Sequence, residues 1–231
     1  MKVLELFCGT KSISKAFAKA GHETFTVDND PQHSPDLCIN ILEFEIKDLP
    51  KGWRTPDVIW ASPPCTTFSV MSIPTYWCNG KPKSYKTYIG LAIAKKTLEL
   101  IKEIDPLYWF IENPLGMLRK QNFMKLLPRK TVTYCQYGTK YRKATDIWTN
   151  NSFWIPKKMC ANGDSCHEEA RRGMRAGIQS DGKKLFGMSD WHNKKDCVKR
   201  AVIPDLLCEE IVKVCEGKQK IKQEILQLCE G

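Results

Sequence analysis

The stretch that most constrains the fold is Asp57–Ser69, which reads DVIWASPPCTTFS. Its apolar run Val58–Ala61 is typical of a strand buried on both faces, as in a parallel sheet covered by helices. The run ends abruptly at two prolines, and Cys65 follows at once. Ligands of open α/β sheets lie beyond the carboxyl ends of the strands. Cys65 is therefore where a nucleophile would act, although a cysteine taken alone is better explained as structural.

The beginning of the chain has the pattern of a nucleotide-binding unit. An apolar strand, Lys2–Phe7, is followed by a turn at Gly9 and a helix, Ser12–Ala20, that Ser12 can cap. A second strand, Glu23–Val27, ends in Asp28. An acidic residue at this distance from the turn can accept hydrogen bonds from a ribose. A βαβ unit that binds no nucleotide fits the same pattern, so both interpretations stay open.

A second candidate residue, Glu112, follows the buried strand Leu107–Ile111. If this strand neighbours the one before Cys65, both side chains project into one crevice. A buried carboxyl group retains its proton more readily and can donate it near neutrality. Taken alone, Glu112 is more simply a capping or solvated carboxylate.

The other expected elements complete a doubly wound, mostly parallel α/β sheet with a small irregular recognition insert. The stretch between Ser62 and Tyr88 has no helical period and is long for a connection, which predicts a lid or binding loop. The remaining predicted elements are a third strand at Ile39–Ile41, a helix at Thr87–Ile104, a hairpin of Thr131–Gln136 and Asp146–Thr149, and helices at Asp205–Cys215 and Gln219–Leu228.

Composition narrows the class of protein. Hydrophobic residues make up 42% of the chain, as in a folded globular protein. The formal net charge of +10 favours an anionic partner, nucleic acid above all. No apolar run approaches the ~20 residues of a membrane span, and no signal peptide is evident, so we expect no membrane association. The eleven cysteines have no disulfide framework, which favours reduced thiols in the cytoplasm.

The composition of the chain changes between Phe153 and Arg200, where pairs of basic residues alternate with Trp154, Phe186 and Trp191. Such a mixture suits phosphate contact and base stacking, although a solvated loop would have a similar composition. We therefore divide the chain into a catalytic and cofactor-binding domain (1–152), a target-recognition insert (153–200) and C-terminal helices that return to the catalytic domain (201–231).

Three residues of the insert raise the question of a metal. Cys160, Cys166 and His167, with Cys197 or His192 further on, could ligate zinc. Their spacing matches no standard ligand pattern and no CxxC pair is present. The sequence therefore predicts no metal site.

The ordered set ELFCGT, TVDND, SPPCTTFS and ENP, with a basic segment after the next strand, resembles the cytosine-5 DNA methyltransferase family, and its compact phage-type members most of all. The resemblance covers roughly residues 1–150 and resumes near 200–211. It implies a fold that binds S-adenosylmethionine and transfers its methyl group to carbon 5 of a flipped cytosine.

The resemblance also implies roles for single residues. Cys65 would add to carbon 6 of the cytosine, Glu112 would protonate ring nitrogen 3, and Arg142 would contact the target base. The cofactor would be bound by Phe7, Cys8, Gly9, Thr10, Asp28, Asn29, Asn40, Ile41 and Pro64. From the basic character of the insert and its flanks, we expect contacts to nucleic acid from Ser69, Lys143, Arg171, Arg172, Arg175, Lys183 and Lys184.

The expected protein is thus a monomeric DNA (cytosine-5)-methyltransferase without an obligate protein partner. Its substrate would be double-stranded DNA, in the host cytoplasm if the gene belongs to a phage, with restriction–modification as one setting. Two alternatives remain open at this point. One is an RNA (tRNA) cytosine-5 methyltransferase of the same fold, and the other is a catalytically inactive nucleic-acid-binding relic.

Overall fold

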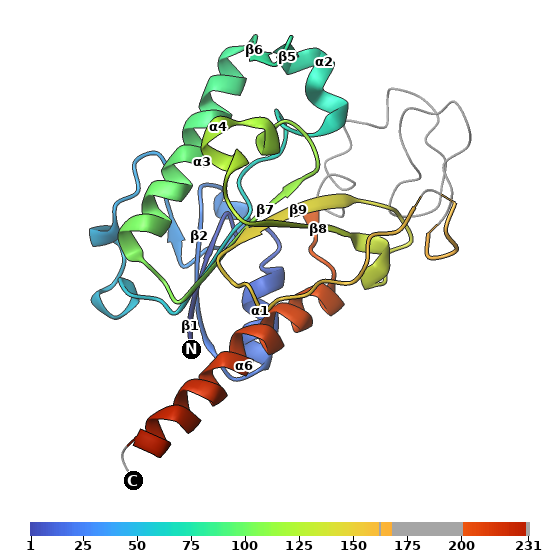
Figure 1. Cartoon of the computed structure of the whole chain (residues 1–231). Helices are drawn as coiled ribbons and strands as arrows, with labels where there is room; N and C mark the ends of the chain where they lie inside the picture. Colours follow the sequence, from blue (N-terminus) through green and yellow to red (C-terminus); the bar gives the residue numbers. More distant parts are fainter. Residues whose placement is uncertain (162, 168–200, 230–231) are drawn as a thin grey trace.

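The computed structural model describes residues 1–161, 163–167 and 201–229. Its centre is a seven-stranded sheet with the order β3-β2-β1-β4-β7-β9-β8 (Figure 1). The first five strands in this order pair in parallel, whereas β9 pairs antiparallel with both β7 and β8. The strands are β1 (Lys2–Leu6), β2 (Glu23–Asp28), β3 (Leu37–Cys38), β4 (Val58–Ala61), β7 (Tyr108–Pro114), β8 (Arg129–Thr133) and β9 (Ala144–Thr149).

Helices cover both faces of this sheet. Figure 1 shows α3 on one face and α1 and α6 on the other, which confirms the predicted doubly wound arrangement. The α-helices are α1 (Ser12–Lys19), α2 (Ile73–Tyr76), α3 (Tyr85–Ile104), α4 (Asn122–Lys125) and α6 (Asp205–Cys229). The remaining elements are the hairpin β5 (Trp77–Cys78) and β6 (Lys81–Pro82) and the 3₁₀ turns η1 (Pro31–His33), η2 (Ile46–Asp48), η3 (Lys51–Trp53), η4 (Val70–Ser72), η5 (Leu118–Lys120) and η6 (Tyr134–Tyr137).

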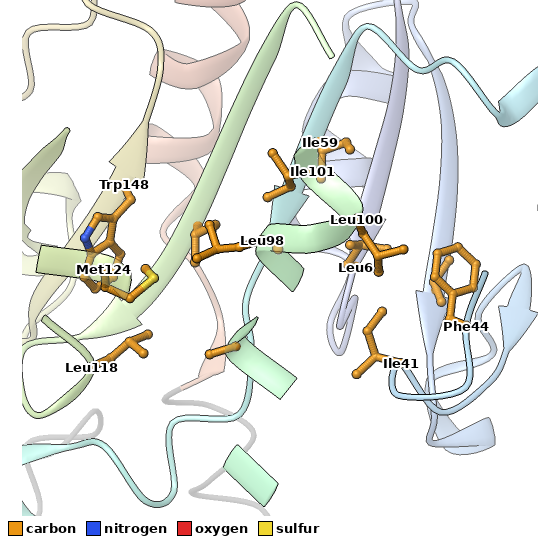
Figure 2. Packing of buried hydrophobic residues seen from close by; sticks show 14 of the residues in the cluster. Leu6, Ile41, Phe44, Ile59, Leu98, Leu100, Ile101, Leu118, Met124 and Trp148 are labelled. Atoms are coloured by element: carbon orange, nitrogen blue, oxygen red, sulfur yellow. The ribbon is translucent and has the colours of Figure 1, made fainter. Parts of the chain in front are cut away.

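The alternation of side chains along β1 assigns the two faces. Leu4 and Leu6 are fully buried in the cluster beneath α3, whereas Val3 belongs to the cluster beneath α1 and α6. Figure 2 shows the first cluster, in which Leu100 and Ile101 of α3 lie over the sheet. Burial of each such side chain contributes about 1.5–3 kcal/mol, so these two layers fix the sheet between the helices.

The strand order predicts a crevice at the carboxyl ends of the central strands. β1 pairs with β2 on one side and with β4 on the other, so the chain reverses its direction of travel across the sheet at this point. In open α/β sheets such a reversal leaves a gap between the loops at the carboxyl ends of the strands. The segments after β1, β2 and β4 all converge there.

Several predicted elements need correction. Ser12 does not cap the start of α1, because Lys11 occupies the N-cap position with φ of 56°. The carboxylate of Glu5 instead accepts a hydrogen bond from the Ser14 amide at 2.8 Å. The third strand is two residues long and ends at Cys38, because the chain turns at Asn40, whose side-chain oxygen accepts from the Leu42 amide at 3.1 Å.

The other two corrections concern longer segments. The C-terminal region is one continuous helix, α6, instead of two, because a single glycine, Gly217, costs a helix only about 1 kcal/mol. The connection after Cys65 is more ordered than a lid without secondary structure, since it contains α2 and the β5–β6 hairpin. Trp77 is buried there and donates from Nε1 to the Thr67 carbonyl at 2.6 Å. Among the described residues, no helix combines the length and the apolar character that crossing a membrane requires.

Candidate active site

A cleft opens at the crevice beside β1, with an empty volume of about 330 Å³ that includes space open to solvent. Six of the residues predicted to bind the cofactor line it, namely Phe7, Asp28, Asn29, Asn40, Ile41 and Pro64. Its other walls are Val27, Ile39 and Ile93, which sequence reasoning missed. Val27 and Ile39 adjoin predicted residues in the chain, but Ile93 comes from α3 and carries no local signal. The lining thus combines apolar walls with one carboxylate and two amides.

The turn between β1 and α1 brings backbone groups to the edge of this cleft. Phe7, Gly9 and Lys11 all have left-handed backbone conformations, with φ of 59°, 44° and 56°. For a non-glycine residue such as Phe7 this conformation costs roughly 1–3 kcal/mol and is typical of functional sites. The Gly9 amide donates to one carboxylate oxygen of Asp28 at 3.0 Å, and the Asp30 amide donates to the other, also at 3.0 Å. These two bonds fix the orientation of the Asp28 carboxylate at the cleft.

Cys8 and Thr10 belong to the same turn, but neither of them lines the cleft. The Cys8 amide donates to the Val27 carbonyl at 3.2 Å. Burial and the nearby Asp28 charge raise the pKa of the Cys8 thiol to about 12, so this thiol stays neutral and is a poor nucleophile. The Thr10 hydroxyl pairs with that of Ser12 at 2.8 Å.

Cys65 lies directly after the cleft residue Pro64, and its side chain is exposed. Its carbonyl oxygen accepts from the amides of Phe68 and Ser69 at 2.9 and 3.1 Å, which closes a tight turn. Pro63 precedes Pro64 in the chain. Its carbonyl oxygen accepts a hydrogen bond from the buried side-chain amide of Asn113 at 2.9 Å. The loop that carries Cys65 is therefore attached to the strand that carries Glu112.

Glu112 is buried and lies on β7, one residue beyond the last β4–β7 pair, Ala61 with Ile111. The Tyr134 hydroxyl donates to its Oε1 at 2.9 Å, and the Lys143 ammonium lies 3.5 Å from the same oxygen. Burial, followed by the negative charge of Glu112, holds the pKa of Tyr134 well above its usual range, so the phenol remains a donor. The Lys143 nitrogen also lies 4.5 Å from the centre of the Tyr134 ring. Tyr134 and Lys143 together orient the Glu112 carboxyl group.

The side chains of the basic residues predicted to contact the target base or nucleic acid have other partners in the structure. Arg142, predicted at the target base, donates instead to the Cys160 carbonyl at 3.2 and 3.4 Å. Lys143, predicted to contact nucleic acid, is the basic residue that reaches Glu112. Ser69 forms an isolated bridge with Gly116, so it holds the Cys65 loop in place.

Trp154 is fully buried, packs edge-on against Phe110 and donates from Nε1 to Glu210 at 2.7 Å. The prediction that it stacks on bases is therefore wrong, because the sheet and α6 cover its ring. The other predicted contacts of the insert, Arg171, Arg172, Arg175, Lys183, Lys184, Phe186 and Trp191, lie outside the described residues.

Comparison with known proteins identifies the family of this chain. The sequence profile of the family described as "C-5 cytosine-specific DNA methylase" matches residues 1–156. A protein of Frog virus 3 (isolate Goorha), named "Probable DNA (cytosine-5)-methyltransferase", is 35% identical over 173 residues, which are 72% of this chain and 78% of the viral protein.

Two solved structures resemble the chain at low identity. The Dnmt2 methyltransferase of S. pombe is 15% identical with a TM-score of 0.46, over 64% of this chain and 50% of that one. The methyltransferase EhMeth of Entamoeba histolytica is 13% identical with a TM-score of 0.46, over 74% of this chain and 57% of that one. The chain thus spans about half the length of these structures. On the strength of the matched profile and the viral relative, the resemblance seen in the sequence is confirmed, and this chain belongs to the C-5 cytosine-specific DNA methylase family.

Proposed function

We propose that this chain methylates carbon 5 of cytosine in DNA, with S-adenosylmethionine as methyl donor, Cys65 as nucleophile and Glu112 as general acid. One observation supports this proposal most strongly. Pro64 lines the cleft, Cys65 follows it, and the Asn113 side chain attaches this loop to the residue next to Glu112. The proposed nucleophile, the proposed acid and the cleft therefore lie on segments that contact one another.

The residues of the cleft fit the proposed cofactor. Phe7, Ile39 and Ile93 offer apolar contact to a flat adenine, and the fixed Asp28 carboxylate can accept hydrogen bonds from ribose hydroxyls. Asn40 also lines the cleft and offers its side-chain amide to the adenine. When bound, S-adenosylmethionine supplies an electrophilic methyl group on a sulfonium.

The chemistry of cytosine explains the need for a thiol beside an acid. Carbon 5 is a poor nucleophile while the ring keeps its conjugation. When the Cys65 sulfur bonds to carbon 6, the electron pair of the 5,6 double bond becomes available at carbon 5. Proton donation by Glu112 to ring nitrogen 3 offsets the charge that this attack places on the ring. After methyl transfer, loss of the carbon-5 proton to water restores the 5,6 double bond and expels Cys65 as a thiolate, and ring nitrogen 3 returns its proton to Glu112.

The base has to leave the helix before Cys65 can reach it. Flipping a base out of a duplex costs a few kcal/mol, so double-stranded DNA as substrate requires contacts that stabilise the open form. The ordered segment from Cys65 through the β5–β6 hairpin lies next to the proposed nucleophile and is suited to cover the base. The viral relative supports modification of a viral or phage genome in the host cytoplasm as the setting.

A test of this proposal compares the parent protein with Cys65→Ala. We expect the variant to lose methyl incorporation from labelled cofactor into DNA, to below ~1% of the parent, because alanine has no thiol to add to carbon 6. Affinity for the cofactor, measured by calorimetry, should stay nearly unchanged. Cys38→Ser, at an exposed cysteine of β3 that does not line the cleft, is the matched control.

The same assay with Glu112→Gln should show turnover lower by ~10²–10⁴-fold, the usual effect of removing a general acid. A mild decrease would leave Glu112 a structural role. Incorporation into tRNA but not DNA would reassign the substrate to RNA, and no incorporation by the parent into either polymer would favour the inactive relic.

A further inference from the structure

Three cysteines and one histidine from two separate segments meet beside β8. Cys135 belongs to η6, which follows β8 directly, whereas Cys160, Cys166 and His167 lie on the segment after β9. Their ligand atoms, three sulfurs and one imidazole nitrogen, all lie within 4.8 Å of one another. The spacing of the last three residues predicted no metal site, because Cys135 is distant in the chain and only the fold brings it to them.

The distances within this cluster suit a single small ion. Around zinc in a tetrahedral site, with Zn–S near 2.3 Å, ligand atoms stand about 3.5–3.8 Å apart. In the structure the sulfurs of Cys135 and Cys160 are 3.2 Å apart. The His167 Nδ1 atom lies 3.8 Å from the Cys160 sulfur and 3.4 Å from the Cys166 sulfur. These three separations lie within about 0.6 Å of the tetrahedral values, and all four ligand atoms lie within 4.8 Å of one another, so one ion could reach them after small movements of the side chains.

The backbone around the cluster is held in place by its own contacts. The Cys160 amide donates to the Thr133 hydroxyl at 3.2 Å, and the Arg142 guanidinium donates to the Cys160 carbonyl. Asp164 accepts from the Ala161 amide at 2.7 Å, which closes the turn between the second and third cysteines. These bonds support the ligand positions from outside the cluster, as the surroundings of metal ligands usually do.

We propose that Cys135, Cys160, Cys166 and His167 bind one zinc ion as a structural site. Three thiolates and one imidazole are a closed, soft ligand set of the kind that structural zinc prefers, and they leave no position for a reacting water. Cys135 follows Tyr134, the donor to Glu112, and the other three ligands lie on the segment after β9. The ion therefore joins the segment after β9 to the wall of the active site.

A disulfide between Cys135 and Cys160 would account for less. Its sulfurs would have to move from 3.2 Å to about 2.05 Å, and the positions of Cys166 and His167 would remain unexplained. Zinc accounts for all four side chains at once.

The experiment measures metal in the full-length protein, expressed in zinc-supplemented medium and purified without chelators. Inductively coupled plasma mass spectrometry should find about one zinc per chain. Replacement by Co²⁺ should produce the strong thiolate-to-cobalt absorption of a tetrahedral site. Cys135→Ser and His167→Ala should bind far less metal, whereas His167→Cys, which restores a fourth ligand, should keep it. Cys78→Ser, at a cysteine outside the cluster, should keep it too.

Circular dichroism separates loss of ligands from loss of the fold in each variant, and the parent's metal content decides the question where a variant does not fold. A parent that binds neither zinc nor Co²⁺ overturns the proposal. So does peptide mapping that finds Cys135 and Cys160 joined as a disulfide in freshly purified protein. Unchanged metal content in folded Cys135→Ser and His167→Ala overturns it as well. The measurement does not depend on methyl transfer, so its outcome is independent of the proposed function.

Discussion

At the scale of single residues, Glu5 is a buried titratable group outside the candidate active site. It lies on the central strand β1, is 2% exposed, and accepts from the Ser14 amide at the start of α1. Burial raises the pKa of Glu5 from 4.5 to about 7, although the Ser14 hydrogen bond and the Lys11 charge act in the opposite direction. The free-energy cost of removing the carboxylate from water is thus larger than the stabilisation by the hydrogen bond and by the Lys11 charge.

This raised pKa predicts that the protein loses stability as pH rises from 4.5 to about 7. In that range the folded state keeps a proton on Glu5 that the unfolded chain has released, so the unfolding free energy falls with pH. The full loss is roughly 3 kcal/mol and is reached once the pH exceeds the pKa of the folded state. Glu5→Gln keeps the hydrogen bond to Ser14 without a charge, and should therefore exceed the parent in stability at pH 8 but not at pH 4.5.

Urea unfolding of both proteins at the two pH values measures the difference. Glu23→Gln, at an exposed glutamate at the start of β2, is the control and should behave as the parent does. An equal difference between Glu5→Gln and the parent at both pH values would contradict the burial argument.

At the scale of elements, Gly116 determines how the Cys65 loop lies on β7. A Cβ atom there would stand 2.0 Å from the Phe68 carbonyl oxygen, and the next residue, Met117, donates its amide to that oxygen at 2.7 Å. The obstructing atoms belong to the backbone, so the loop itself would have to move. The close approach of these two segments fixes the position of Cys65 relative to Glu112.

We expect Gly116→Ala to lower methyl transfer by at least ~10²-fold, because a displacement of about 1 Å at a reacting group has that effect. Affinity for S-adenosylmethionine should change little, since Gly116 does not line the cleft. Gly52→Ala, whose Cβ would meet only the end of the Lys2 side chain at 3.6 Å, is the matched control. Normal turnover in Gly116→Ala would show that the loop tolerates displacement.

The continuity of α6 leads to another prediction. Gly217 lies inside the helix, and an added Cβ would meet nothing within 4 Å. Gly217→Ala should therefore raise the unfolding free energy by about 0.4–1 kcal/mol, because alanine loses less conformational entropy in a helix. A destabilised variant, measured by thermal unfolding, would instead indicate a break between two helices at this glycine.

At the scale of the whole molecule, the net charge of +10 predicts binding to DNA that depends on salt. Removing one side chain that neutralises a phosphate lowers the slope of log affinity against log salt by about 0.9. Replacing Arg171 and Arg172, or Lys183 and Lys184, by alanine should therefore reduce the slope by up to about 1.8 for each pair. Lys47 and Lys51, exposed residues of η2 and η3, form the control pair. Equal slopes for all three variants would remove the basic segment from DNA binding.

Local patterns in the chain were sufficient to predict most of the strands, the glycine turn with Asp28, and the placement of Cys65 and Glu112 after two apolar runs. Apolar periodicity and turn residues act over a few positions, and the rule for parallel sheets then brings strand ends together. The packed fold was needed to show that Glu5 caps α1, that Lys143 and not Arg142 reaches Glu112, and that Ile93 closes the cleft.

The same holds for Cys135, which joins residues 25 to 32 positions further along the chain only after β8 and β9 have paired. These contacts are made by side chains on separate elements, and packing of the sheet and its helices fixes their distances. No short-range pattern in the chain contains that information.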